Sequence, residues 1–145
     1  MLKGIPPIIS PELLKILMEM GHGDEIVIGD GNFPAASNAN RLVRADGHGI
    51  PELLAAILRL MPLDPYVEKP VTLMQVVKGD DYDPVIWEEY RAIIDKYVVH
   101  KIDLGYIDRF SFYERASKAY AIIATGEESL YANIILKKGV VKNYW

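Results

Sequence analysis

Short apolar runs alternate with stretches of helical periodicity along this chain, and one of these runs restricts the fold most. Ile134, Ile135 and Leu136 are consecutive apolar residues, so in an extended strand they point to both faces of a sheet. Such a strand is stable only where other elements cover it on both sides. The pattern therefore predicts an α/β protein, built as a three-layer α/β/α sandwich around a sheet.

The expected helices have apolar residues at three- and four-residue spacing, and the expected strands are short apolar runs. Ser10 and Pro11 favour a helix start, and Ser111 and Glu114 have the spacing of a capping box. Some strand-to-strand connections are too short for crossovers, which predicts a mixed sheet. We expect helices at 11–20, from 51 to 61, at 85–97 and at 110–118, strands at 25–29, 42–45, 71–77, 100–104, 120–125 and 132–136, and a loop at 31–40.

The composition indicates one domain, residues 1–145, of ordinary charge. Hydrophobic residues make up 50% of the 145, which is enough for a core. A net charge of −4 with scattered basic residues argues against nucleic-acid binding, and the absence of cysteine excludes disulfides. The N-terminus does not resemble a signal peptide, and no apolar run reaches the ~20 residues of a membrane span. We therefore expect a cytoplasmic protein with no membrane partner.

His22 and Asp30 are the strongest candidates for acid/base chemistry. His22 stands between Gly21 and Gly23 just after a predicted helix, where it serves either as a proton donor or as a C-capping residue. Asp30 follows a predicted buried strand, at the kind of edge where α/β sheets bind ligands. The alternative for Asp30 is a turn aspartate that holds the next backbone groups.

Three further residues have side chains suited to binding a polar ligand. Tyr131 and Asn133 are two apart on a predicted strand, so their phenol and amide are expected on one face. Arg109 is expected at the entrance of the 110–118 helix, and the alternative for it is a surface ion pair with Asp108 or Asp103. Tyr131 and Asn133 could equally satisfy backbone groups at a strand edge.

Other familiar sites are disfavoured. The residues that could be metal ligands have no recognised metal-ligand spacing, so we expect no metal. They are His22, Asp24, Asp30, Asp46 and His48. The glycines lack the patterns of phosphate-binding loops, and the two Gly-His-Gly segments do not form a serine elbow.

Four longer segments of the chain form a distinctive combination. They are SPELLKILMEMGHGDEIVIGDGNFPA (10–35), RADGHGIPELLAAIL (44–58), RFSFYERASKAYAIIATGE (109–127) and YANIILKKGV (131–140). Together they resemble the family of L-fucose mutarotases and D-ribose pyranases, the RbsD/FucU family, and they cover nearly the whole chain in the family's order. The arginine before FYERA and the ATGE segment resemble the fucose branch.

The resemblance implies an isomerase that interconverts the α and β anomers of a monosaccharide, L-fucose in this branch, without a cofactor. It assigns His22 as the catalytic residue. It also implies a homodecameric ring with sites near subunit interfaces. The residues it assigns to sugar binding are Asp30, Arg109, Tyr131, Ala132 and Asn133.

Two departures from the family pattern and two alternatives remain. Gly29 and Gly31 flank Asp30 where alanine or another small residue is expected, which predicts a looser loop. Residues 141–145 extend the family's usual ending, so Trp145 is expected either at a subunit contact or in a tail. The alternatives are a D-ribose pyranase or other monosaccharide mutarotase, and a non-catalytic sugar-binding or regulatory protein on the same fold.

Overall fold

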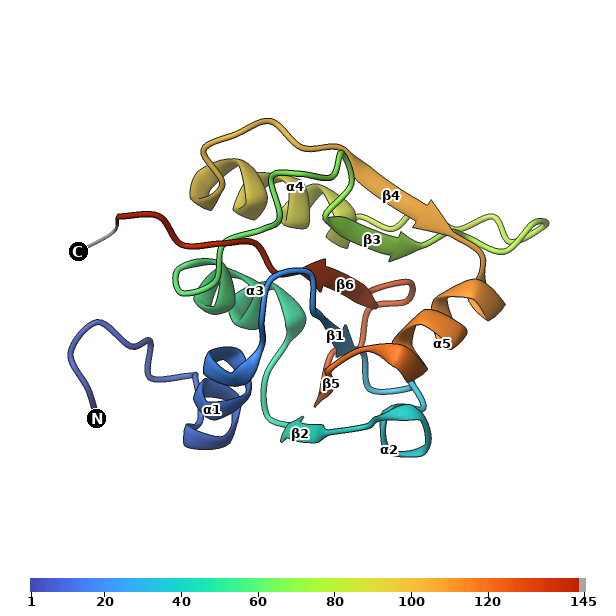
Figure 1. Ribbon diagram of the computed structural model, residues 1–145. Helices are drawn as coiled ribbons and strands as arrows, with labels where there is room; N and C mark the ends of the chain where they lie inside the picture. The colour runs from blue at the N-terminus through green and yellow to red at the C-terminus, as the bar shows by residue number, and fades with distance from the viewer. Residues whose placement is uncertain (144–145) are drawn as a thin grey trace.

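The computed structural model describes residues 1–143 and contains a six-stranded sheet in the order β2-β5-β1-β6-β3-β4 (Figure 1). The helices are α1 (Pro11–Glu19), α2 (Ala35–Asn38), α3 (Ile50–Leu58), α4 (Ile86–Tyr97) and α5 (Arg109–Lys118). The strands are β1 (Glu25–Gly29), β2 (Leu42–Ala45), β3 (Val71–Met74), β4 (Leu104–Ile107), β5 (Ala121–Thr125) and β6 (Ile134–Lys137).

Strand β6 makes the sheet mixed. It lies between β1 and β3 and runs antiparallel to both, whereas β1 and β5, β2 and β5, and β3 and β4 pair in parallel. The chain reaches β6 from β5 through residues 126–133, a connection with no helix. Because a parallel neighbour needs a longer crossover, β6 enters in the opposite direction. The expected mixed sheet is confirmed.

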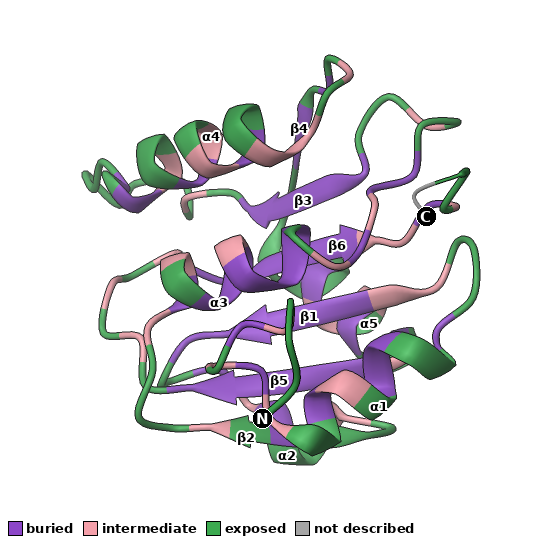
Figure 2. Ribbon diagram, turned by 90° about the vertical axis from the view of Figure 1, so that its left-hand side faces the viewer, coloured by how far each residue is buried: buried purple, intermediate pink, exposed green. Residues whose placement is uncertain are grey.

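Helices cover both faces of the sheet. On one face, α1, α3 and α4 pack on alternate strand residues such as Ile28 and Ile134. On the other, α2 and α5 pack on the intervening residues, including Val27 and Ile135. Figure 2 shows the inner strands buried over most of their length, and Ile135 has no exposed surface. The three-layer α/β/α sandwich is confirmed, together with the prediction that β6 is covered on both sides.

Several predicted boundaries are wrong. Residues 31–40 contain the short helix α2, and β3 ends at Met74 rather than Val77. The strand expected at 100–104 starts only at Leu104. Asp108, not Ser111, caps α5: its side chain accepts a hydrogen bond from the Ser111 backbone N–H at 3.0 Å. By contrast, Ser10 caps α1 as predicted and accepts from the Leu13 N–H.

Strand β6 begins at Ile134, so Tyr131 and Asn133 precede it and do not share a strand face. Tyr131 has φ of 56°, in the left-handed region that strand residues do not adopt. The interpretation of Trp145 as a contact or a tail concerns a residue outside those described. None of the helices within residues 1–143 is long and apolar enough to cross a membrane.

Candidate functional site

His22 lies in the turn between α1 and β1 and does not cap the helix. The ammonium of Lys138 donates to the carbonyls of Leu17 and Met20 at 2.8 and 2.5 Å, which occupies the end of α1. Gly23 has φ of 86°, a conformation that favours glycine, and its N–H donates to the Lys138 carbonyl at 2.8 Å. The C-capping interpretation of His22 is therefore wrong.

His22 is paired with Asp64, a residue that the sequence did not indicate. Its Nε2 lies 3.1 Å from Asp64 Oδ1, and its ring centroid lies 5.5 Å from that of Tyr66. The His22 side chain is 45% exposed, whereas that of Asp64 is only 6% exposed. An accessible imidazole is thus held by a buried carboxylate.

The hydrogen bonds of Asp64 favour its ionised form. Burial raises the pKa of this carboxyl group, but hydrogen bonds from the Tyr66 backbone N–H and from His22 outweigh burial, and the net effect lowers the pKa. An ionised carboxylate only accepts hydrogen bonds, so Nε2 of His22 carries the donated proton. In the neutral ring Nδ1 then has the free lone pair.

Asp30 directly follows β1, at the opposite end of that strand from His22, and is 8% exposed. Its Oδ1 accepts from the Asn32 backbone N–H at 3.0 Å, which is the turn interaction weighed for this residue. Burial, with a smaller contribution from the charge of Glu127, raises the pKa of Asp30 against the lowering effect of backbone N–H groups. The carboxylate is therefore both fixed in place and sparsely solvated.

The two glycines beside Asp30 are positions of close packing, so the expected loosening is wrong. A Cβ on Gly29 would lie 2.7 Å from Cδ1 of Phe33, and one on Gly31 would lie 3.2 Å from the Glu127 carbonyl oxygen. The Gly31 N–H donates to that carbonyl at 2.8 Å. Both glycines hold the Asp30 turn close to its neighbours.

The segment 131–133 meets Asp30 at this end of the strands. Asn133 Oδ1 accepts from the Asp30 backbone N–H at 2.8 Å, so the interpretation of Asn133 as satisfying a backbone group is confirmed. The Tyr131 hydroxyl donates to Asp80 Oδ2 at 2.6 Å. Ala132 has no exposed surface, so it can offer a ligand only its backbone.

Arg109 is the first residue of α5, and its side chain is near the same end of the strands. Its guanidinium carbon lies 5.2 and 5.9 Å from the ring centroids of Phe110 and Tyr113. Its charge acts to lower the pKa of Tyr131, but the hydrogen bond to Asp80 has the larger effect and raises it. Within residues 1–143 Arg109 forms no ion pair with Asp108 or Asp103.

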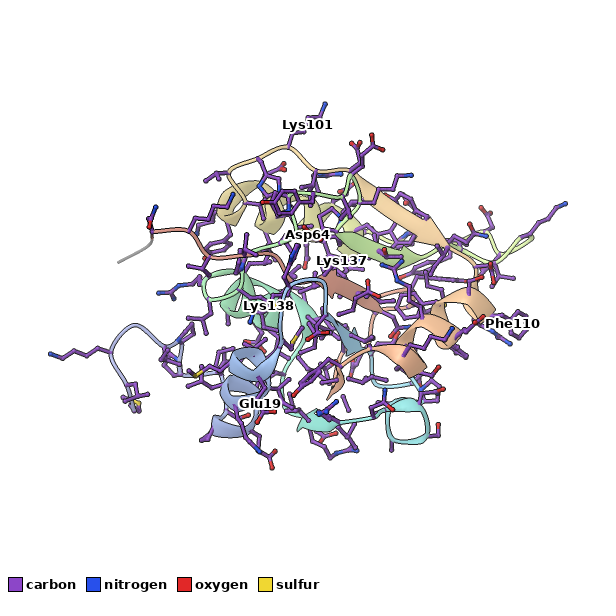
Figure 3. All side chains as sticks on the ribbon, viewed as in Figure 1. Glu19, Asp64, Lys101, Phe110, Lys137 and Lys138 are labelled. Carbon is purple, nitrogen blue, oxygen red and sulfur yellow. The ribbon has the colours of Figure 1, made fainter. Side chains whose placement is uncertain are left out.

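The candidate residues form two groups at opposite ends of the strands. We call His22 and Asp64 the His–Asp pair, and Asp30, Arg109, Tyr131, Ala132 and Asn133 the strand-end cluster. Strand β1, which spans about 13 Å, separates them. In Figure 3, Asp64 and Lys138 are labelled near the centre of the view, and Phe110 is labelled apart from them, at the N-terminal end of α5. Asp30 therefore cannot orient His22 of its own chain.

The other residues considered for a metal are dispersed. His48 Nδ1 lies 3.3 Å from Glu52 Oε1, and Arg44 pairs with Asp46. Within residues 1–143 no group of three or more potential ligands is arranged to hold a metal ion. A cavity of about 420 Å³ opens between the C-terminal ends of α3 and α4, and it is lined by neither group.

The fold and its two polar groups define an α/β protein with an accessible imidazole held by a buried carboxylate and, at the opposite strand ends, a cluster of fixed polar groups. The chain belongs to the RbsD/FucU family. The sequence model described as the RbsD / FucU transport protein family matches residues 3–141.

Several relatives are similar to this chain over almost their whole length. An L-fucose mutarotase from Actinobacillus pleuropneumoniae is 52% identical, covering 97% of each chain, and the human fucose mutarotase is 51% identical, covering 97% of this chain and 94% of its own. The Streptococcus pneumoniae fucose mutarotase, solved with L-fucose, has a TM-score of 0.93 and 61% identity over 97% of this chain and all of its own. Bacillus subtilis RbsD with D-ribose has a TM-score of 0.75 and 25% identity over 98% and 100%.

Proposed function

We propose that this protein is an L-fucose mutarotase, an isomerase that interconverts the α and β anomers of the sugar. The observation that carries the proposal is the likeness to the Streptococcus pneumoniae enzyme in complex with L-fucose, at 61% identity and a TM-score of 0.93. The D-ribose complex of RbsD is much less similar, at 25% identity. Fucose is therefore a better supported substrate than ribose.

The reaction needs only proton transfers. The ring oxygen of the hemiacetal gains a proton while the anomeric hydroxyl loses one, and the ring opens to an aldehyde. Rotation about the C1–C2 bond and closure from the other face give the second anomer. One positioned acid/base group typically contributes ~10²–10⁴-fold, and no cofactor or metal enters these steps.

His22 is the proposed acid/base group, and it works through Nδ1. Asp64 holds Nε2–H, so Nδ1 is the nitrogen that exchanges a proton with the sugar. When His22 accepts a proton, the buried carboxylate of Asp64 stabilises the imidazolium. Asp64 thus acts through His22 and need not touch the sugar.

The strand-end cluster is the proposed sugar-binding half. Asp30 presents a carboxylate fixed by the Asn32 N–H, and Asn133 presents an amide fixed by the Asp30 backbone N–H. Tyr131 and Arg109 add a phenol and a cation. Sugar hydroxyls donate and accept hydrogen bonds, so such a mixed set can orient a pyranose. Because fixed groups lose little freedom on binding, the cluster favours affinity.

The separation of the two groups supports a site made by two chains. A sugar held at Asp30 of one chain can reach only an imidazole supplied by another chain packed against that end of the strands. The homo-oligomer, a decameric ring, is therefore part of the proposal. Light scattering coupled to size-exclusion chromatography measures it, and an active monomer would contradict it.

The proposal also includes one domain over residues 1–145 and a cytoplasmic location. The sheet, which joins elements from β1 to β6, supports the former. Cooperative unfolding in a single transition, and fractionation of cells that produce the protein, test these two statements.

Anomer exchange provides the direct test of function. Saturation transfer between the α and β anomeric NMR signals of L-fucose, D-ribose and D-galactose is measured with and without protein. We expect fastest exchange for L-fucose, and a loss of about 10²-fold or more in His22→Ala. Binding of L-fucose without exchange would support the non-catalytic alternative, and unchanged exchange in His22→Ala would refute the assignment of that residue.

A further inference from the structure

Helix α4 contacts the strand-end cluster through two side chains that no motif indicated. Trp87 Nε1 donates to the Tyr131 carbonyl at 2.8 Å, and the Tyr90 hydroxyl donates to the Ala132 carbonyl at 2.6 Å. Trp87 and Tyr90 are three residues apart, so they lie on one face of the helix. Two successive carbonyls of the sugar-binding segment are thereby held by one rigid element.

Tyr131 needs such support because its backbone is unfavourable. Its φ of 56° brings Cβ close to a carbonyl oxygen, and residues with a side chain keep this conformation only where their surroundings impose it. Tyr131 also precedes β6, so no strand pairing fixes it. The bonds from α4 supply the missing constraint.

Packing restrains both donors. Tyr90 is completely buried, so its hydroxyl has no access to water and must bond within the protein. The Trp87 ring packs against Tyr106 with ring centroids 5.2 Å apart, which fixes the direction of its N–H. Packing thus restrains both side chains, and they in turn restrain the backbone of residues 131–133.

The constraint extends to the phenol of Tyr131. With the backbone fixed, the hydroxyl reaches Asp80, and it accepts from the Val77 backbone N–H at 3.3 Å. Its ring centroid lies 5.8 Å from that of Tyr82. The orientation of Tyr131 toward the loop that follows β3 thus depends on the carbonyl held by Trp87.

We propose, resting on the proposed function, that Trp87 and Tyr90 are positioning residues that set the affinity for the monosaccharide without touching it. They hold the 131–133 backbone in the conformation that binds the sugar. Trp87 and Tyr90 bond to the 131–133 backbone and not to the His22–Asp64 pair, so we expect the proton transfer itself not to depend on them. Loss of either donor therefore raises KM and leaves kcat and its pH profile nearly unchanged.

The variants Trp87→Phe and Tyr90→Phe test this: Tyr90→Phe removes only the hydroxyl, and Trp87→Phe removes the N–H donor while keeping an aromatic ring. Tyr97→Phe is the matched control, because Tyr97 is on the same helix and its hydroxyl forms no hydrogen bond within residues 1–143. We expect KM for L-fucose to rise about fivefold in each test variant, as for the loss of one hydrogen bond, and to stay unchanged in the control. Melting temperature is recorded for each variant.

Hydrogen exchange at the amides of residues 131–133, measured without sugar, provides a readout that does not need activity. We expect faster exchange there in Trp87→Phe and Tyr90→Phe than in the wild type and Tyr97→Phe. Unchanged KM, or a fall in kcat and melting temperature at constant KM, overturns the positioning role. If the wild type does not interconvert the anomers, the proposed function is refuted. Amide hydrogen exchange then tests α4 on its own, and rates that are unchanged in Trp87→Phe and Tyr90→Phe refute its positioning role.

Discussion

Replacing Asp64 with asparagine removes the charge beside His22 while keeping the size and both acceptor contacts of the side chain. Oδ1 accepts from His22 Nε2 at 3.1 Å and from the Tyr66 N–H at 3.0 Å, and an amide oxygen can accept both. The imidazole therefore keeps its orientation and its Nε2–H form. What it loses is the negative charge that stabilises the imidazolium during proton transfer.

The expected fall in kcat follows from the type of hydrogen bond that is lost. A hydrogen bond to a charged group contributes about 1 to 1.5 kcal/mol more than a neutral one. If that difference is expressed in the transition state, Asp64→Asn lowers kcat about five- to tenfold. We expect KM to stay unchanged, because in the proposed site Asp64 acts through His22 and need not touch the sugar.

Saturation-transfer NMR at several L-fucose concentrations separates kcat from KM in this variant. Asp103→Asn, at an exposed position, is the control for net charge and should behave as the wild type. A rise in KM at constant kcat, or no change at all, would refute the role given to Asp64. Equal losses in Asp64→Asn and Asp103→Asn would point to net charge instead.

The pH dependence of the free energy of unfolding is an independent test of the Asp64 carboxylate. The folded-state pKa of Asp64 is lowered, so its stabilising contribution is present above the unfolded pKa of about 3.9 and is lost as pH falls through the folded value. Asp64→Asn should therefore be less stable than the wild type near pH 7, with the difference shrinking below about pH 4. Urea unfolding across this range measures it, and a difference that persists unchanged at low pH would contradict the ionised state.

Two further predictions concern assembly and the end of α1. Co-expressed His22→Ala and Asp30→Ala chains, each inactive alone, should form mixed oligomers in which about one quarter of the sites are intact; no recovery would mean that one chain supplies both residues. Lys138→Met should lower the free energy of unfolding by about 1–3 kcal/mol, because two helix carbonyls lose a charged donor. Lys118→Met, at an exposed position, should change it by less than about 0.5 kcal/mol in the same urea titration.

The strands that the sequence predicted well are those whose signal is local. Residues 25–29 and 42–45 are short, mostly apolar segments, and β1 and β2 occupy the same residues. The edge strand β4 was misplaced because apolar residues occur on both sides of its start and exposed Tyr106 breaks the run. Helix α2 is too short to show any period.

The candidate site shows the same limit. His22 and Asp30 were recognisable from their own segments, but Asp64 lies 42 residues from His22 in a connector without periodicity. Its place is set by pairing across the chain, where the Asp64 N–H donates to the Lys137 carbonyl at 3.0 Å. Trp87 and Tyr90 were seen only as helix residues, because the carbonyls they reach are 44 and 42 positions away.

The span of β1 has a consequence for how an assembly of these chains is built. In the proposed homo-oligomer, each chain contributes its imidazole to one site and its strand-end cluster to another. The length of β1, a strand of five residues, then sets the distance between neighbouring sites. A longer β1 would change that distance at every subunit of the proposed ring at once.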